Sequence, residues 1–399
     1  MKTVTVTLIF LIILAAANTL SAADWERHTI DPASGIDHRS GADGIRPADI
    51  NGDGLIDFVT GWEQGNAIRF CLNPGPEKVK EPWEATTVAK VTSAEDAVFA
   101  DLDGDGVLDV ITATEGKRRT VFVSWAPNEQ ERITDSTAWK TSAFPETKNK
   151  QWWMYTLPLD VDLDGDIDLL LGSKSSGASL TWLENPGHKR ARTLTAWETH
   201  RLFDVGWIMS LRLLEENGKR NVVFSDRKGL HSGVFLLPLL QEEPWFGKPV
   251  CIGAPNEEVM FLDLAYLDDD EKLDVVAAIR PRGIKILYQP DKPLSLWEDT
   301  ADLDPIPEGK FGEAKAVRVG DLDGDAIPDF AITCEHADGK KRGVLWSNVF
   351  SEYFPISNER GVKFDRIELI DLDADGDLDL VTCEEKTGLG VIWFENPLH

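Results

Sequence analysis

Carboxylate side chains recur at a fixed spacing in this chain of 399 residues. In the stretch DLDGDGVLD, residues 101–109, aspartates stand at positions 1, 3, 5 and 9, and an apolar run follows at once. Alternate carboxylates on one tight loop repel one another unless a cation lies between them, and Ca2+ accepts roughly six to eight oxygen ligands from such a loop. Gly106 suits a sharp turn with positive φ. The stretch predicts a calcium loop; for a single copy, the alternative is a polar turn between two strands.

Four further stretches repeat this spacing, which gives about five predicted Ca2+ sites. The predicted metal ligands are Asp49, Asn51, Asp53, Asp57, Asp101, Asp103, Asp105, Asp109, Asp160, Asp162, Asp164, Asp168, Asp321, Asp323, Asp325, Asp329, Asp371, Asp373, Asp375 and Asp379. An EF-hand does not fit, because it needs a glutamate at position 12, where Thr60 and Thr112 stand. We assign the Ca2+ a structural role; a catalytic metal is the alternative.

Two further units are incomplete. One has Asp268, Asp270 and Asp274 but carries Tyr266 at position 1 and Glu271 where glycine is expected. The other, residues 213–221, has lost the ligands. The ninth positions of all seven units are residues 57, 109, 168, 221, 274, 329 and 379, so the period is 50–59 residues. A period of this size indicates a propeller or a repeat array.

Each unit offers four short strands. The first leads into the aspartate loop, the second leaves it, the third precedes an Asn-Pro pair, and the fourth begins with tryptophan, as at Trp83. Seven such units predict an all-β fold, a seven-bladed β-propeller. The chain ends after a third-strand pattern and opens, at residues 25–30, with a fourth-strand pattern. The N-terminal strand should therefore complete the last blade and cover its open edge.

The repeats resemble the FG-GAP/VCBS family, as in the integrin α-subunit β-propeller. The stretches that carry the resemblance are DINGDGLIDFV, DLDGDGVLDVI, DVDLDGDIDLLLG, DLDGDAIPDFAI and DLDADGDLDLV, with WLENPG and WFENP downstream. The resemblance implies a propeller fold and Ca2+ binding. It does not specify a function, because the family includes adhesion receptors, lectin-like modules and sugar-degrading enzymes.

The N-terminus predicts export. Residues 1–23 have a positive start, an apolar core and a small-residue cleavage site near Ala23, as in a signal peptide. Residues 24–399 then form one propeller domain, secreted or periplasmic, without a membrane span and monomeric. The net charge of −28 argues against nucleic acid and anionic membranes. Four cysteines are too few for a disulfide scaffold, and we expect all four to be free or buried.

The face opposite the aspartate loops is the predicted ligand surface. Ten of the 14 tryptophans belong to third or fourth strands. The other four, Trp62, Trp152, Trp153 and Trp207, fall in loops predicted on that opposite face. Aromatic rings there can stack on sugars or anchor a protein; local loop packing is the alternative.

One charged residue per unit stands six residues after the ninth position, at the start of a hairpin. These residues are Glu63, Glu115, Lys174, Arg227, Arg280, Glu335 and Glu385. If the register holds, they form an acidic arc and a basic arc around one mouth of the ring; charged hairpin starts without function are the alternative. Beside Tyr155 and the tryptophans, the basic arc suits the carboxylate of an acidic sugar.

A second set of charged residues belongs to the first strands. It comprises Arg46, Asp263, Arg318 and Glu368, which we expect to pair with one another across the channel.

These patterns are compatible with three functions, of which the first two use this face as a ligand site. The first is a binding module for a carbohydrate or protein, with a polysaccharide or an exported or cell-surface protein as partner. The second is a carbohydrate-active lyase or dehydratase acting on an acidic sugar, and its candidate bases are His38, Tyr155, His231 and His336, although no local catalytic motif links them. The third is a scaffold for other exported proteins.

Overall fold

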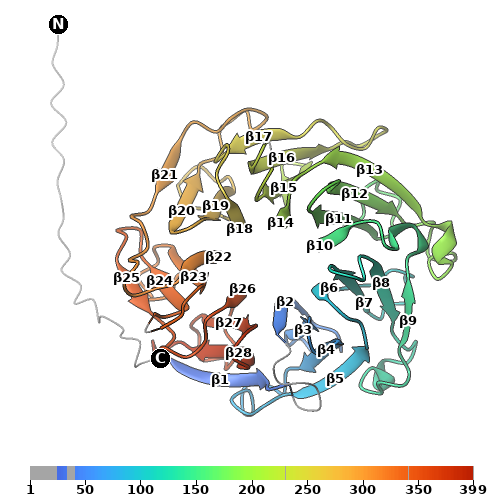
Figure 1. Cartoon of the computed structure of the whole chain (residues 1–399), viewed down its shortest axis with the longest axis horizontal. Coiled ribbons are helices and arrows are strands. Elements are labelled where there is room, and N and C mark those ends of the chain that lie inside the picture. The colour runs from blue at the N-terminus through green and yellow to red at the C-terminus, as the bar shows by residue number, and fades with distance from the viewer. Residues whose placement is uncertain (1–24, 34–40, 230, 340, 399) are drawn as a thin grey trace, which may run out of the picture.

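The computed structural model describes residues 25–33, 41–229, 231–339 and 341–398. Within these residues the strands form seven four-stranded sheets, arranged as blades around one axis (Figure 1). The predicted seven-bladed β-propeller is therefore confirmed. No helix in the described ranges is long and apolar enough to cross a membrane. The predicted signal peptide and His38 lie outside the described residues.

Each blade has its first strand at the axis and its fourth at the rim (Figure 1). Blades 1 to 3 comprise β2 (Ala42–Ala48), β3 (Asp57–Trp62), β4 (Ala67–Leu72) and β5 (Glu84–Ala89); β6 (Ala94–Ala100), β7 (Asp109–Thr114), β8 (Val121–Trp125) and β9 (Lys140–Ala143); and β10 (Trp152–Leu159), β11 (Asp168–Lys174), β12 (Ser179–Glu184) and β13 (Glu198–Asp204). Blades 4 and 5 comprise β14 (Ile208–Glu216), β15 (Lys219–Asp226), β16 (Gly233–Leu239) and β17 (Val250–Gly253); and β18 (Val259–Ala265), β19 (Asp274–Ile279), β20 (Gly283–Leu287) and β21 (Thr300–Asp302). Blades 6 and 7 comprise β22 (Glu313–Gly320), β23 (Asp329–Glu335), β24 (Val344–Ser347) and β25 (Tyr353–Pro355); and β26 (Phe364–Ile370), β27 (Asp379–Glu384), β28 (Gly390–Glu395) and β1 (Glu26–Asp31). Short 3-10 turns η1 (Gln130–Arg132), η2 (Pro145–Thr147) and η3 (Leu194–Ala196) lie in the connections.

Blade 7 closes the ring. β1 lies beside β28 (Figure 1) and pairs with it antiparallel, so that His28 stands opposite Trp393. The two rings are in contact, tilted by 30° with their centroids 4.6 Å apart. Ile30 of β1 is fully buried in a cluster shared with blades 1 and 7. The prediction that the N-terminal strand completes the last blade is confirmed, and the edge of β28 is covered.

The aspartate at the ninth loop position accepts a hydrogen bond within its own loop in every complete loop, and in four of the five it also joins the loop to the third strand of its blade. Asp109 is 1% exposed, and its two carboxylate oxygens accept hydrogen bonds from the amides of Leu102 and Ala126. Asp57, Asp168 and Asp379 make the same pair of bonds, and so does Asp274 in the incomplete loop of blade 5. The buried carboxylate thus ties the first loop of a blade to the end of its third strand, because buried acceptors need partners.

The Asn-Pro pairs join neighbouring blades. The side-chain amide of Asn185 donates to the carbonyl oxygen of Leu102 in blade 2 at 2.9 Å, and that of Asn396 donates to Leu322 in blade 6 at 3.0 Å. Both asparagines are buried. The fourth-strand tryptophans also serve packing: Trp83, for example, is 5% exposed and donates its indole N–H to a backbone carbonyl.

Blade 4 keeps its strands without an aspartate loop, as its sequence predicts. Strands β14 and β15 are joined by Asn217-Gly218, both with positive φ, which is the turn that matches the twist of a hairpin. In blade 5, Lys272 lies 2.6 Å from Asp270 and also pairs with Asp291. A lysine therefore supplies positive charge at this incomplete loop.

A β-bulge interrupts the first strand of every blade. Each register shift lies near the start of the strand, as between Trp153 and Tyr155 in β10 or Ala314 and Ala316 in β22. The other five first strands, β2, β6, β14, β18 and β26, contain the same kind of shift. A bulge breaks the alternation of side chains between the two faces of a strand. It therefore changes which side chains reach the axis.

Four side chains plug the channel at the axis: Asp96, Tyr155, Phe261 and Arg366. Nη1 of Arg366 lies 2.9 Å from Oδ1 of Asp96, and the two side chains are 7% and 1% exposed. The guanidinium carbon of Arg366 is 4.3 Å from the ring centroid of Tyr155 and 5.1 Å from that of Phe261. The plug joins blades 2, 3, 5 and 7 across the axis.

We predict that Arg366→Ala lowers the free energy of unfolding by about 3–5 kcal/mol, because Asp96 is left buried without its partner. Denaturant unfolding measures the change. Arg132→Ala is the matched control, since Arg132 forms a surface pair with Asp135 and its side chain is 52% exposed. That pair should contribute at most about 1 kcal/mol. Equal losses in the two variants would contradict the role of the plug.

Candidate functional site

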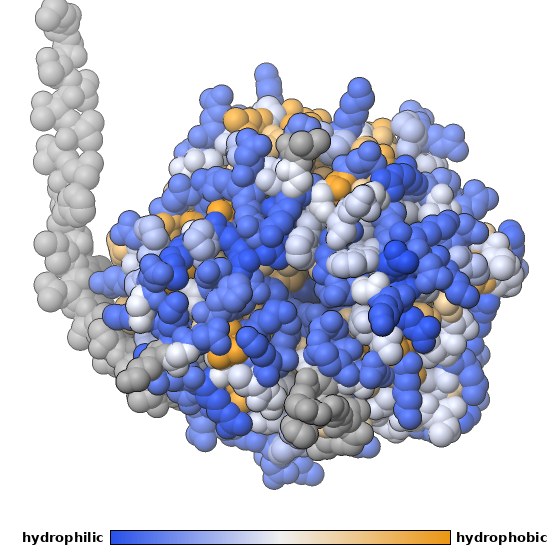
Figure 2. Space-filling view, in the orientation of Figure 1, coloured by the Kyte–Doolittle hydropathy of each residue, from blue (hydrophilic) through white to orange (hydrophobic). Residues whose placement is uncertain are grey.

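Two cavities lie along the axis, on either side of the plug. The upper cavity, of about 320 Å³, opens on the side where the second and third strands of each blade are joined. The lower cavity, of about 220 Å³, lies toward the aspartate loops. Phe261 and Arg366 line both cavities and so form the wall between them. Figure 2 shows the hollow at the centre of the ring, surrounded mostly by hydrophilic surface.

The upper cavity is built from two sets of charged side chains. Its lining contains six carboxylates and six cations: Asp43, Glu63, Glu95, Glu115, Glu335 and Asp365, with Lys174, Arg227, Arg280, Lys315, Lys363 and Arg366. Six of these twelve side chains, such as Glu63 and Lys174, stand at the starts of the hairpins after the second strands. The other six lie in the first strands or, in the case of Lys363, one residue before β26. The structure therefore brings together the residues predicted to share a register at the hairpin starts. Glu385, the seventh of them, forms ion pairs with Lys315 and Lys363, which line the cavity.

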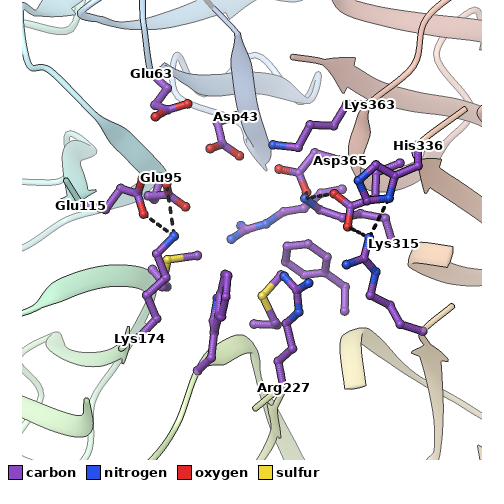
Figure 3. A pocket seen from close by; sticks show the side chains of 17 residues that line it. Asp43, Glu63, Glu95, Glu115, Lys174, Arg227, Lys315, His336, Lys363 and Asp365 are labelled. Atoms are coloured by element: carbon purple, nitrogen blue, oxygen red, sulfur yellow. Dashed lines mark hydrogen bonds and ion pairs between the residues drawn. The ribbon is translucent and has the colours of Figure 1, made fainter. Parts of the chain in front are cut away.

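The cations of the hairpin starts are paired with acids of neighbouring blades, so they do not form a free basic arc. Lys174 contacts Glu115 directly and lies 3.7 Å from Glu95 (Figure 3). Arg227 lies 2.6 Å from Glu258. The two arcs expected from the sequence thus neutralise one another at the places where blades meet, because a partly buried charge needs a partner close by.

On the opposite side of the cavity, Arg280 contacts Glu335 and lies 3.0 Å from Glu313. Lys315, which Figure 3 labels beside Asp365, is 8% exposed and sits 3.7–3.8 Å from the carboxylates of Glu335, Asp365 and Glu385. These separations are longer than hydrogen bonds. The Lys315 ammonium group therefore interacts with all three carboxylates through charge attraction rather than through direct hydrogen bonds.

Burial and these pairs shift the pKa values of the acids in different directions. Burial raises the pKa of Glu95, and that of Asp43, well above the ordinary range. It also raises the pKa of Glu385 to about 7. Burial opposes ionisation of Asp365 too, but the ammonium of Lys315 lowers its pKa to about 2. Burial thus favours the neutral form of Glu95 and Asp43, whereas the Lys315 ammonium favours the ionised form of Asp365.

The aromatic residues predicted to form the ligand face are divided by the structure. Trp207 lines the upper cavity, with Lys174, Arg227 and Lys228 4.4–5.4 Å from its ring centroid. Trp152 is 36% exposed and has Lys174 5.6 Å from its ring centroid.

Trp62 and Trp153 are each 2% exposed and pack inside the blades, which corrects their predicted place on the surface. The reason is that β3 runs on through Trp62 and β10 already begins at Trp152, so both side chains belong to strands rather than loops.

The candidate bases do not share one site. Tyr155 is 3% exposed and lines the lower cavity, away from Lys174 and Arg227. His231 is exposed and lines neither axial cavity. His336 lines the upper cavity, with Nδ1 3.1 Å from Nη2 of Arg280 and 3.2 Å from Oε2 of Glu313. His336 is thus the candidate base that the structure places beside a basic hairpin-start residue.

The charged residues of the first strands behave largely as expected. Arg318 lies 2.9 Å from Asp263 and 3.0 Å from Glu368, so these three pair across the channel. Arg46 differs: it donates to the carbonyl oxygen of Thr156 at 2.9 Å. All four cysteines are free.

One set of cavity residues shares a single position in the repeat and could have been found from the sequence. Six residues before the first loop position stand Asp43, Glu95, Met154, Trp207, Lys315 and Asp365, all of which line the upper cavity. The sequence analysis used only the position three residues before the loop. The positions six and three residues before the loop are an odd number of residues apart. Regular strand alternation would place them on opposite faces, so without knowledge of the bulge there is no reason to inspect both.

The aspartate loops lie on the other side of the ring. Carboxylate oxygens of Asp101, Asp103 and Asp105 all lie within 4.8 Å of one another. One buried oxygen each of Asp103, Asp160 and Asp373 has no hydrogen-bond partner. Nearby cations partly offset the charge, such as Arg192, which contacts Asp103. The oxygen donors and the orphaned oxygens fit a hard dication.

Comparison with known proteins agrees with the fold. A family model of the FG-GAP-like repeat matches residues 35–112. Among curated proteins, no sequence match was found. Two chains from crystal structures of BBS1N in complex with ARL6DN, one soaked with mercury and one with lead, match with TM-scores of 0.53 and 0.54.

The identities to these two chains are 11% and 10%, over 93% and 94% of this chain and 95% and 97% of those chains. This likeness shows the fold alone. Together, the matched repeat and the ring of seven four-stranded blades fit an FG-GAP-repeat β-propeller.

Proposed function

We propose that the chain is an exported, calcium-stabilised propeller that binds a carbohydrate in the upper cavity. The observation that carries the proposal is the cavity itself: about 320 Å³, lined by six carboxylates and six cations beside Trp207. Its volume falls at the small end of ligand sites, which span roughly 300–1,000 Å³. Sugar hydroxyls both donate and accept hydrogen bonds, so they can use both kinds of charged group.

The balance of charge favours a polyhydroxylated ligand over a strongly ionic one. Every hairpin-start cation of the cavity has a carboxylate partner within 4 Å. A ligand with many hydroxyl groups can add hydrogen bonds to such pairs without displacing either member. An acidic sugar can still place its carboxylate near Trp207, where Lys174, Arg227 and Lys228 converge. A protein partner is the alternative, and BBS1N is a propeller-like neighbour seen in complex with another protein.

We predict that Trp207→Ala weakens binding of the best glycan in a panel of neutral and acidic polysaccharides by tenfold or more, on the order of 1.4 kcal/mol or above, because a stacked aromatic ring is lost. Isothermal titration of the mature chain in Ca2+ measures this. Tyr266→Ala is the control, since Tyr266 is 58% exposed but begins the incomplete aspartate loop of blade 5, on the other face. Absence of glycan binding by the parent protein would overturn the carbohydrate proposal and favour a protein partner.

Calcium is proposed at the five complete loops, held by the residues at loop positions 1, 3 and 5. Four of the five ninth aspartates, such as Asp109, already accept two backbone amides, and each oxygen keeps a further lone pair for a metal. The role is structural: Ca2+ would relieve the repulsion among carboxylates that face one another on one loop. Export would place the loops where Ca2+ is plentiful.

We predict that a chelator lowers the melting temperature, since each site contributes about 2.7 kcal/mol when free Ca2+ is about 100-fold above its dissociation constant. Asp103→Ala should remove part of this effect and reduce the bound Ca2+, measured by atomic emission, by about one ion per chain. Asp268→Ala in the incomplete loop of blade 5 is the matched control and should change neither value. A melting temperature that does not respond to the chelator argues against structural Ca2+.

A carbohydrate lyase is the second candidate, and His336 is the observation that favours it. A base beside a cation is the minimum arrangement for β-elimination from a uronate, and His336 lies next to Arg280. Tyr155 lines the lower cavity, and Phe261 and Arg366 separate it from His336, so the two residues cannot act on the same substrate.

We predict that incubation with acidic polysaccharides yields no unsaturated ends, as expected of a binding module. New ultraviolet absorbance from such ends would reverse this assignment. In that case His336→Ala should abolish the product, because proton abstraction loses its base, while His231→Ala should leave it unchanged.

A further inference from the structure

The lower cavity differs from the upper one in its charge. Four arginines line its 220 Å³, namely Arg46, Arg212, Arg318 and Arg366, and they come from blades 1, 4, 6 and 7. Glu368 is the single carboxylate among the lining residues described. The upper cavity, by contrast, is lined by equal numbers of acids and cations.

Two of the four arginines use the carboxylates that are available. Arg318 holds Asp263 and Glu368, at 2.9 and 3.0 Å. Arg366 holds Asp96 at 2.9 Å as part of the plug. Arg318 and Arg366 therefore make the direct ion pairs to the three carboxylates, while Arg212 attracts Asp263 and Glu368 from beyond salt-bridge distance.

The other two arginines have no carboxylate within salt-bridge distance in the described part of the chain. Arg46 donates to the neutral carbonyl oxygen of Thr156 and lies over the ring of Tyr155, 4.7 Å from its centroid. Arg212 has no hydrogen bond or ion pair to any described residue, and its Nε is buried without a partner. Four guanidinium groups thus face three carboxylates at the axis, which leaves one positive charge unbalanced in a confined space.

The surplus positive charge affects the pKa of Tyr155. Its hydroxyl group is buried, which opposes ionisation, yet Arg46, Arg212 and Arg366 together lower the pKa of the phenol. A net fall in the pKa of a buried phenol means that the local potential favours negative charge. The effect agrees with the charge count from the geometry.

We propose that the lower cavity binds a small oxyanion, such as a carboxylate, sulfate or phosphate group, between Arg46 and Arg212 beside Tyr155. Guanidinium forks match planar and tetrahedral oxyanions and hold them by charge-assisted hydrogen bonds. The bound anion balances the surplus charge of the channel and gives Arg212 its missing partner. This site is distinct from the carbohydrate site, because Phe261 and Arg366 separate the two cavities.

Sulfate is the probe of choice, since phosphate precipitates with the Ca2+ that the loops are proposed to need. Isothermal titration of the mature chain in Ca2+ buffer should give saturable binding of one sulfate per chain. Acetate in a second titration shows whether a planar carboxylate serves as well as a tetrahedral anion. Arg212→Gln should weaken sulfate binding by roughly tenfold or more, because a charge-assisted pair is lost. Arg132→Gln, which alters an exposed surface arginine, should leave the affinity unchanged.

Arg46→Gln provides an independent variant, to be used alone if Arg212→Gln does not fold. Spectrophotometric titration of tyrosine gives a second readout: sulfate should raise the pKa of Tyr155, because a bound anion offsets the guanidinium groups, and Tyr155→Phe identifies the signal. Two results would overturn the proposal: no saturable binding of sulfate or acetate by the parent protein, or an affinity for sulfate that is unchanged in the folded variants of Arg46 and Arg212.

Discussion

The axis of this propeller depends on the β-bulge near the start of each first strand. In a regular strand, successive side chains face opposite sides of the sheet, so every second residue would reach the channel. With the bulge, consecutive residues both reach it: Asp365 lines the upper cavity and Arg366 both cavities, while Met154 lines the upper and Tyr155 the lower. This doubling supplies enough side chains to build a plug and two separate cavities in one channel.

Electrostatics then gives the two cavities different characters. In the upper one, acids and cations of adjacent blades pair around the ring, as between Lys174 and Glu115, and the lining carries equal numbers of each sign. In the lower one, arginines outnumber the carboxylates that can reach them. Because charges in a narrow channel are poorly solvated, such a difference acts strongly on what can enter. One fold thus offers a neutral polar site and a positively charged site on the same axis.

Much of this architecture was predictable from local patterns. The repeat unit occurs once per blade, with a complete aspartate loop in five of the seven, and Trp83 and its equivalents anchor the fourth strands, so the number of blades and the closing role of β1 follow from spacing alone. The candidate ligand face was predicted less well. Trp207 lies in the upper cavity, whereas Trp62 and Trp153 are buried, because they belong to strands β3 and β10 rather than to the loops in which they were predicted.

The sequence by itself determined the repeat, the order of strands in each blade and the positions of the aspartate loops, because each of these depends on residues close together in the chain. It also predicted that Arg318, Asp263 and Glu368 would pair, since they share one position in the repeat. Only the tertiary structure decided which side chains meet at the axis. Asp96 and Arg366 are 270 residues apart and come from different blades, so their pairing exists only once the ring has closed and the bulges have turned both side chains inward.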